Sequence, residues 1–236
     1  MKTKAVFIII LLLSAGIASA DYANRDEIKS DLNALYQAKE KGDNDAIMTV
    51  SKRILASNKT AGVTRIPALL CSADVLAKQN RIEAVNDLFD RQIKFVMKSS
   101  GNCSVAVFTA MKADFWKDTG HYDLAIDDYQ LAIDKCPNTD NAYSKLSLLY
   151  STSSDPKYND PAKALSLALK AVEIEACSKS LSALAAAYAK AEKFDLALAH
   201  IEKAIGAGEK EKLSPSQIDE LRAKLSMYKS RQSNGS

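Results

Sequence analysis

The sequence has 236 residues, 47% of them hydrophobic, so it has the length and the apolar content to bury a sizeable core. Its formal net charge is +3, and two lysines of this small excess lie within the first 20 residues. The rest of the chain is close to neutral, which argues against non-specific nucleic-acid binding, because such binding depends on clustered Lys and Arg. Eight glycines and five prolines are few for this length, and the composition favours helices joined by short turns over a β-sheet protein.

The first predicted element is a secretory signal over residues 1–20. Lys2 and Lys4 precede an uncharged run that ends in the small-residue sequence Ala-Ser-Ala, a cleavage pattern. The alternative is an uncleaved membrane anchor, but the run is shorter than the roughly 20 apolar residues that a spanning helix needs. We therefore expect an exported chain, periplasmic or secreted, that begins at Asp21 and is not stably inserted in a membrane.

A degenerate helical hairpin is predicted over residues 21–62. Apolar residues recur at helical spacing before Gly42 and again after it, as in two amphipathic helices that turn at this glycine. The first apolar face consists of Ile28, Leu32, Leu35 and Tyr36, and the second of Ala46, Val50 and Ile54.

The clearest pattern in the chain is a repeat unit over residues 106–139. Alanines at three positions allow two antiparallel helices to approach closely, and aromatic residues fill the remaining gaps. A glycine permits the tight turn between the helices, and a proline ends the second one. The positions that carry the pattern are Ala113, Trp116, Gly120, Tyr122, Ala125, Tyr129, Ala132 and Pro137.

This unit resembles a tetratricopeptide repeat, a helical hairpin of about 34 residues. The same packing position recurs at Val85, Ala125, Ala164 and Ala197, and inserted residues, including the turn 151–161, account for the longer steps. The resemblance implies an all-α fold, an α-solenoid of stacked antiparallel helical hairpins in a superhelix. Four repeats are predicted, over residues 66–99, 106–139, 140–177 and 178–212.

A capping helix is predicted over residues 213–230, after the last repeat. Ser214 is its expected N-cap, and Pro215 occupies the first helical position, where a missing N–H costs nothing. A terminal helix with one apolar and one polar face keeps the end of a solenoid soluble. We expect residues 231–236 to form a disordered tail.

The repeats also bear on the origin of the chain. Residues 160–228 are similar to the C-terminal repeats of bacterial tetratricopeptide proteins, which favours a bacterial origin. Glycosylation sequons at Asn58 and Asn102 leave a eukaryotic secretory compartment as the alternative.

The sequence offers no constellation of residues that supports an enzyme. Its two histidines, His121 and His200, have no partner His, Cys or carboxylate at a metal-like spacing, and we interpret them as solvated surface residues. Asp127 and Asp128 lie on a predicted helix, whereas calcium requires a loop of closely spaced oxygen ligands. A phosphate-binding loop and a dinucleotide fingerprint are both missing. We expect no catalytic residue, no cofactor and no metal.

The four cysteines suggest a structural role in an oxidising compartment. Cys103 begins the hairpin that Cys136 ends, so one bridge between these two is geometrically reasonable. A second possibility pairs Cys71 with Cys103 and Cys136 with Cys177. The third is that the thiols remain free and buried, where they pack as small apolar groups.

The resemblance implies a protein-binding groove lined by the inner helices of the repeats. Trp116, Tyr143 and Tyr150 occupy family packing positions and are expected in the core, while the turn 151–161 is a further candidate contact. The lysine and asparagine pattern with which some relatives clamp a terminal carboxylate is missing, because aspartates stand where asparagine is expected. The predicted groove residues are Asp74, Lys78, Asp114, Lys117, Asn141, Ser144, Leu148, Ala186 and Lys190.

These observations predict a periplasmic or secreted scaffold for protein–protein interaction, an adaptor or assembly factor that binds a protein or peptide in its groove. The alternative is a chaperone-like holder or pilot for a secreted or outer-membrane substrate, which requires broader and transient binding. No feature of the sequence selects a surface for self-association, and an enzyme is the least supported class.

Overall fold

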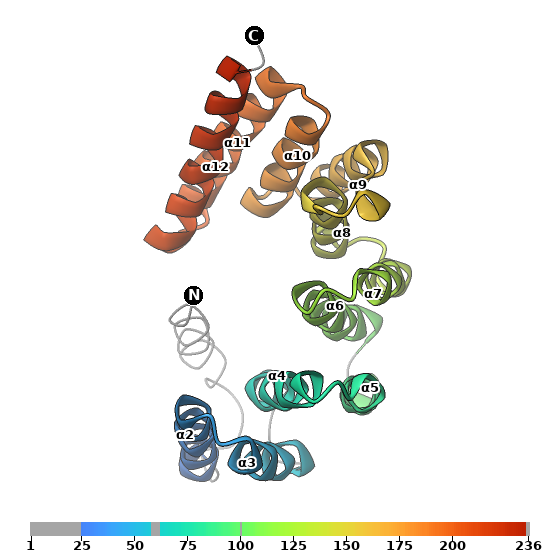
Figure 1. Cartoon of the computed structure of the whole chain (residues 1–236), viewed down its shortest axis with the longest axis vertical. Coiled ribbons are helices and arrows are strands. Elements are labelled where there is room, and N and C mark those ends of the chain that lie inside the picture. The colour runs from blue at the N-terminus through green and yellow to red at the C-terminus, as the bar shows by residue number, and fades with distance from the viewer. Residues whose placement is uncertain (1–24, 58–61, 100, 235–236) are drawn as a thin grey trace. The chain divides into compact units, whose positions relative to one another are not determined.

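The computed structural model describes residues 25–57, 62–99 and 101–234. Every regular element within these ranges is helical, and none of the helices there is long and apolar enough to cross a membrane. The chain divides into two compact units, Met1–Ser99 and Ser100–Ser236, each built from antiparallel helical hairpins. The predicted all-α solenoid class is therefore confirmed (Figure 1). The predicted signal over residues 1–20 lies outside the described residues.

The described part of unit 1 contains four helices around an apolar core. Asp43 caps the second helix by accepting a hydrogen bond from the backbone N–H of Ala46, and Gly42 before it adopts a left-handed φ of +69°. The core joins the first three helices through buried residues that include Leu35, Ile54 and Cys71. The helices are α2 (Arg25–Lys41), α3 (Asn44–Ala56), α4 (Gly62–Lys78) and α5 (Ile82–Ser99).

Unit 2 consists of three successive hairpins and a final helix. Each hairpin packs an inner helix, the first in sequence, against an outer helix, the second, and the last helix packs against the third hairpin. The hairpins are α6 (Asn102–Asp118) with α7 (Tyr122–Lys135), α8 (Asp140–Thr152) with α9 (Pro161–Ile174), and α10 (Ser178–Lys190) with α11 (Phe194–Lys210), followed by α12 (Pro215–Asn234).

Alanines hold the helices of unit 2 close together. Each outer helix contributes two or three alanines that are completely buried, and larger side chains there would force the helices apart, because protein interiors are close-packed. Trp116 and Tyr150 are buried as predicted, whereas Tyr143 is only half-buried. The buried alanines of the outer helices are Ala125, Ala132, Ala164, Ala168, Ala171, Ala197 and Ala204.

Glycine and proline mark the helix ends that the pattern predicts. Gly120 has a φ of +83°, and the N–H of His121 donates to the carbonyl of Trp116 at 2.8 Å, which closes the end of α6. Helix α9 begins at Pro161, and the Asp160 side chain accepts from the N–H of Lys163 at 2.9 Å.

The last helix begins as predicted but ends later. Its first residue is Pro215, directly after Ser214, although the Ser214 hydroxyl donates to the Gln217 side chain at 2.8 Å and does not cap a backbone N–H. The helix continues to Asn234, so the prediction of a disordered tail is wrong for residues 231–234. The chain has neither glycine nor proline between Pro215 and Gly235, and nothing stops the helix earlier.

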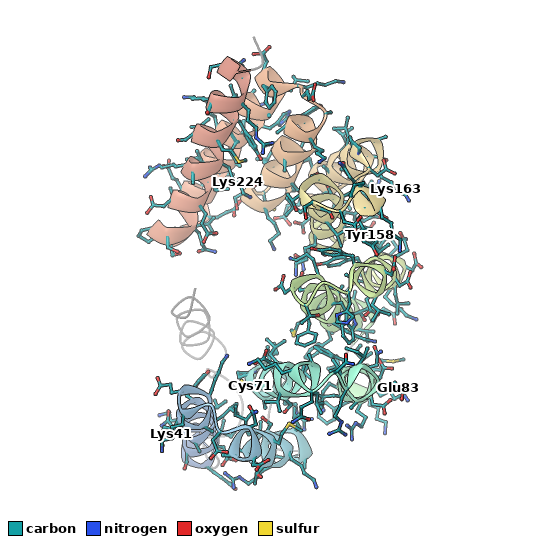
Figure 2. The ribbon with its side chains drawn as sticks, in the orientation of Figure 1. Lys41, Cys71, Glu83, Tyr158, Lys163 and Lys224 are labelled. Atoms are coloured by element: carbon teal, nitrogen blue, oxygen red, sulfur yellow. A yellow bond between two sulfur atoms is a disulfide. The ribbon has the colours of Figure 1, made fainter. Side chains whose placement is uncertain are left out.

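The inserted turn 151–161 packs against the preceding hairpin. Its centre forms the short 3-10 helix η2 (Pro156–Tyr158), and the Tyr158 ring meets the Tyr122 ring edge-on with 5.1 Å between centroids. Lys157 Nζ lies 2.8 Å from an Asp123 carboxylate oxygen. These contacts to α7 give the turn a defined position in unit 2 (Figure 2).

Candidate protein-binding surfaces

The predicted groove residues of unit 1 pair with each other. Asp74 and Lys78 lie one helical turn apart on α4, with 2.7 Å between the Lys78 amine and the Asp74 carboxylate. Exposed pairs at this spacing stabilise a helix by only about 0.3–0.5 kcal/mol. Either side chain is therefore able to exchange its partner for a ligand at little cost.

Asp114, predicted to face a ligand, instead ties three helices together. Its carboxylate accepts hydrogen bonds from the Tyr129 hydroxyl on α7 and from the Lys145 amine on α8. Burial of Tyr129, together with the neighbouring Asp114 charge, raises the pKa of that phenol above its usual value, so it remains a proton donor. Asp114 is thus a structural residue at the edge of the surface, while neighbouring Lys117 pairs with Asp118 at 3.3 Å.

Two of the predicted groove residues are buried and offer no contact surface. The Ser144 side chain is 0% exposed on α8, and its hydroxyl has no hydrogen-bond partner. Ala186 on α10 is 6% exposed. The prediction is wrong for both, because the packing of the helices buries these positions.

Three lysines connect alternate helices of unit 2, from α6 to α12. The Lys145 amine donates to Asp114 between α8 and α6, and the Lys179 amine donates to Asn141 Oδ1 at 3.1 Å between α10 and α8. In the same way, the Lys224 amine on α12 donates to Ser182 Oγ on α10 at 2.9 Å (Figure 2). Burial lowers the pKa of Lys224. These bridges show that one side of α6, α8, α10 and α12 forms a continuous surface.

We define the inner surface of unit 2 as the partly or fully exposed residues on this side of α6, α8 and α10. Residues three or four apart share a helix face, so the bridging residues identify the other members. Leu148 and Val107 add apolar area, and Val107 is 52% exposed. The members are Val107, Asp114, Lys117, Asn141, Lys145, Leu148, Lys179 and Lys190.

The sequence prediction missed three residues of this surface. Lys179 is the second residue of α10, as Asn141 is of α8, so the repeat alignment already contained the signal for it. Lys145 lies one turn after Asn141 on the same helix face. Val107 is the second residue of the predicted repeat 106–139, as Asn141 is of the predicted repeat that begins at residue 140. The register of the repeats was therefore sufficient to find all three.

The histidines are more enclosed than the sequence suggested. His121 Nδ1 lies 3.1 Å from the Thr119 hydroxyl, and its ring meets Trp116 edge-on. His200 stacks on Tyr188, and its Nδ1 is buried without a partner. Desolvation lowers the pKa of His200. Within the described residues, no group of three or more His, Cys, Asp and Glu side chains is placed to hold a metal ion.

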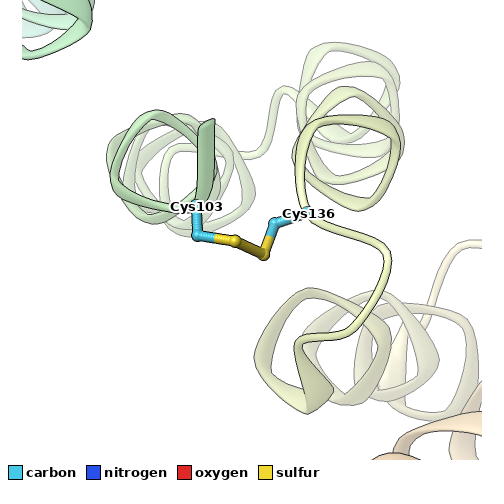
Figure 3. The surroundings of a disulfide bond; sticks show 2 residues. All are labelled: Cys103 and Cys136. Atoms are coloured by element: carbon cyan, nitrogen blue, oxygen red, sulfur yellow. A yellow bond between two sulfur atoms is a disulfide. The ribbon is translucent and has the colours of Figure 1, made fainter. Parts of the chain in front are cut away.

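A disulfide joins Cys103, in the first turn of α6, to Cys136, directly after α7 (Figure 3). The predicted pairing of Cys103 with Cys136 is therefore correct. The alternative, which pairs Cys71 with Cys103 and Cys136 with Cys177, is wrong. Cys71 is a buried free thiol whose pKa is raised by burial. The half-buried Cys177 thiol donates to Asp140 at 3.3 Å. The bridge closes the open end of the hairpin whose inner helix begins the inner surface.

Comparison with known proteins identifies the fold. No protein-family model matches the sequence, and no curated protein matches it. Among solved structures, the chain is similar to TTC0263, a thermophilic TPR protein of Thermus thermophilus, with 18% identity and a TM-score of 0.51 over 85% of this chain and 98% of that one. It is also similar to BtubC from P. vanneervenii, with 13% identity and a TM-score of 0.54 over 88% and 84% of the two chains.

At these sequence identities the similarity concerns the fold alone. The chain has the fold of tetratricopeptide-repeat (TPR) proteins, as the repeat pattern of residues 106–139 predicted. Helix pairing, buried alanines and the glycine turn agree with this assignment.

Proposed function

We propose that this chain is an exported protein-interaction scaffold, an adaptor or assembly factor, whose inner surface in unit 2 holds a segment of another protein. The observation that carries the proposal is the set of bridges Asp114–Lys145 and Asn141–Lys179, which align one face of three helices. The TPR fold supports it, because stacked hairpins create extended surfaces suited to binding. Residues 1–20, with the features of a secretory signal, support export to a periplasm or to the medium.

A rigid surface favours binding because it loses little conformational freedom when a partner docks. Bridges between inner helices, buried alanines and the Cys103–Cys136 disulfide all restrain the helices that form this one. The surface should therefore select one bound geometry. This property suits an adaptor better than a chaperone-like holder, which requires a broad and adaptable apolar surface.

The chemistry of the surface indicates the kind of segment it binds. Lys117, Lys145, Lys179 and Lys190 outnumber Asp114 among its members, and Val107 and Leu148 provide apolar contacts. A complementary segment carries carboxylates around one or two apolar side chains.

The test is crosslinking in the exported fraction with a charge-reversed inner surface. The variant carries Lys179→Glu and Lys190→Glu, and the matched control carries Lys135→Glu and Lys203→Glu on the exposed sides of α7 and α11. A discrete partner should crosslink to the native chain and to the control but not to the Lys179/Lys190 variant. Retention of that partner by the variant refutes the inner surface. Equal crosslinking of many unrelated unfolded proteins supports the holder instead.

A further inference from the structure

A second surface lies wholly within unit 1, on the side formed by its outer helices. A cavity of about 810 Å³ opens between α3 and α5, and α4 forms its floor. Ser72 and Leu76 belong to that floor and are buried. The inner-surface proposal does not involve this groove.

Each wall of the groove is one face of a helix. On α3 the wall includes Met48, Lys52 and Leu55, and on α5 it includes Leu88 and Phe95, with spacings of three, four or seven residues in both cases. At about 1.5 Å per residue, the walls run for roughly 12–16 Å, the length of two to three helical turns. The groove is thus a slot with apolar side chains along its length.

The groove carries an excess of positive charge. Lys52, Arg81 and Arg91 line it and are exposed, and none of them forms an ion pair with the described part of the chain. Asp87 is the acidic residue among the lining side chains. A ligand with carboxylates beside apolar groups is complementary both to the apolar walls and to these cationic side chains.

Arg65 connects the two walls at one end of the groove. Its guanidinium donates to the Leu55 carbonyl and to the Gln92 side chain, each at 3.1 Å, and lies 3.7 Å from the centre of the Phe95 ring. These contacts connect the end of α3 with α5 through a buried side chain on α4. These contacts restrain the separation of the two walls at this end without a ligand.

We propose that the α3/α5 groove binds an acidic amphipathic helix of about two to three turns from a partner protein. The apolar side of that helix enters between Met48 and Phe95, and its flanking carboxylates meet Lys52, Arg81 and Arg91. A second copy of the chain is a poor occupant, because groove against groove brings cations together. The segment 1–20 carries Lys2 and Lys4 and no acid, so it lacks the complementary charge.

The test measures binding of designed peptides to the full chain by fluorescence anisotropy. The probe is a labelled helix of about 14 residues with leucines on one side and glutamates on the other, and a second probe replaces every glutamate with lysine. The glutamate probe should bind, with an affinity that falls as salt rises, and the lysine probe should not.

Charge reversal locates the site. The variant Lys52→Glu with Arg91→Glu should weaken binding of the glutamate probe by at least about tenfold. The matched control, Lys29→Glu with Lys94→Glu, changes two exposed lysines of unit 1 outside the groove and should stay within about twofold. Met48→Asp, which puts a carboxylate into the apolar wall, should also abolish binding.

Each other outcome overturns the proposal. It is wrong if the glutamate probe fails to bind, if the lysine probe binds equally, or if the Lys52/Arg91 variant binds as well as the control. Sedimentation that shows a dimer of the native chain, broken by the Lys52/Arg91 changes, assigns the groove to a second copy. Because the Lys179/Lys190 variant leaves unit 1 intact, it should bind the probe normally, so failure of one surface is distinguishable from failure of the other.

Discussion

The disulfide allows a quantitative test of how unit 2 is stabilised. It joins Cys103 and Cys136 across a sequence separation of 33 and closes the hairpin α6/α7. In the loop-entropy relation, a bridge that closes a loop of this length stabilises the folded chain by about 3.7 kcal/mol at 25 °C. Replacing both cysteines by alanine should lower the free energy of unfolding of this hairpin by about that amount.

Trp116 reports on the affected hairpin alone. It is the single tryptophan of the chain, its side chain is 0% exposed, and it lies within the loop that the disulfide closes. Urea titration followed by its fluorescence should therefore detect the loss. For a dependence of about 1–3 kcal/mol per molar urea, the midpoint should move down by roughly 1–4 M.

The control is reduction of the native chain. A reductant should move the native midpoint to that of the Cys103→Ala, Cys136→Ala variant and should leave the variant unchanged. Alkylation of the unfolded, unreduced chain should label Cys71 and Cys177 only. Labelling of all four cysteines would refute the pairing, and equal midpoints for native chain and variant would refute the entropic argument.

Three further predictions concern single residues. Ser144→Ala removes a buried hydroxyl that has no partner and should leave stability unchanged or raise it by about 1 kcal/mol, whereas a clear loss in urea denaturation contradicts the assigned burial. Gly120→Ala should destabilise the folded chain by about 1–2 kcal/mol, because Gly120 has a positive φ. Gly206 lies in the middle of α11 with free space around it, so Gly206→Ala should stabilise the folded chain by about 0.5–1 kcal/mol. Burial lowers the pKa of His200, so the stability that the neutral imidazole contributes is complete above pH 6.5, the ordinary pKa of histidine, and is lost as the pH falls below that value. His200→Phe should flatten the pH dependence of the free energy of unfolding between about pH 7.5 and about pH 5.5. An unchanged pH dependence in the variant contradicts this prediction.

Much of the fold could be read from the sequence because the repeat combines several independent signals. Trp116, Gly120 and Pro137 indicate a core position, a turn and a helix stop within one unit. In the structure Trp116 is buried, Gly120 lies in the turn with a positive φ, and α7 ends before Pro137. The end of α12 was harder to predict, since a polar sequence without glycine or proline fits a helix as well as a tail.

The binding surfaces were less predictable because they depend on which helix faces which. The register placed Ser144 and Asp114 on inner helices, but it did not show that packing buries Ser144. It also did not show that Asp114 binds Tyr129 in its own hairpin and Lys145 in the next one. The α3/α5 groove depends on the separation of two helices that are joined only through α4. No periodicity within a single helix encodes that separation.

The disulfide shows where topology adds to the sequence. Four cysteines allow three complete pairings, and spacing alone does not choose among them. Once the hairpin forms, Cys103 and Cys136 lie at its open end with their Cα atoms 4.9 Å apart, within the range that a disulfide requires. The fold therefore selects the pair.

The lysine bridges of unit 2 differ in how readily they can yield an amine to a partner. Lys145 is held by the Asp114 carboxylate, which also accepts from Tyr129, so the attraction between two opposite charges adds to this hydrogen bond. Lys179 is held by the neutral amide oxygen of Asn141, and its side chain is exposed. A partner carboxylate that replaces the neutral Asn141 amide adds a new attraction between opposite charges, whereas one that replaces the Asp114 carboxylate only exchanges one such attraction for another. Lys179 is therefore the lysine of the inner surface best placed to exchange its internal contact for a ligand, and Lys145 the one best placed to keep the helices aligned while it does so.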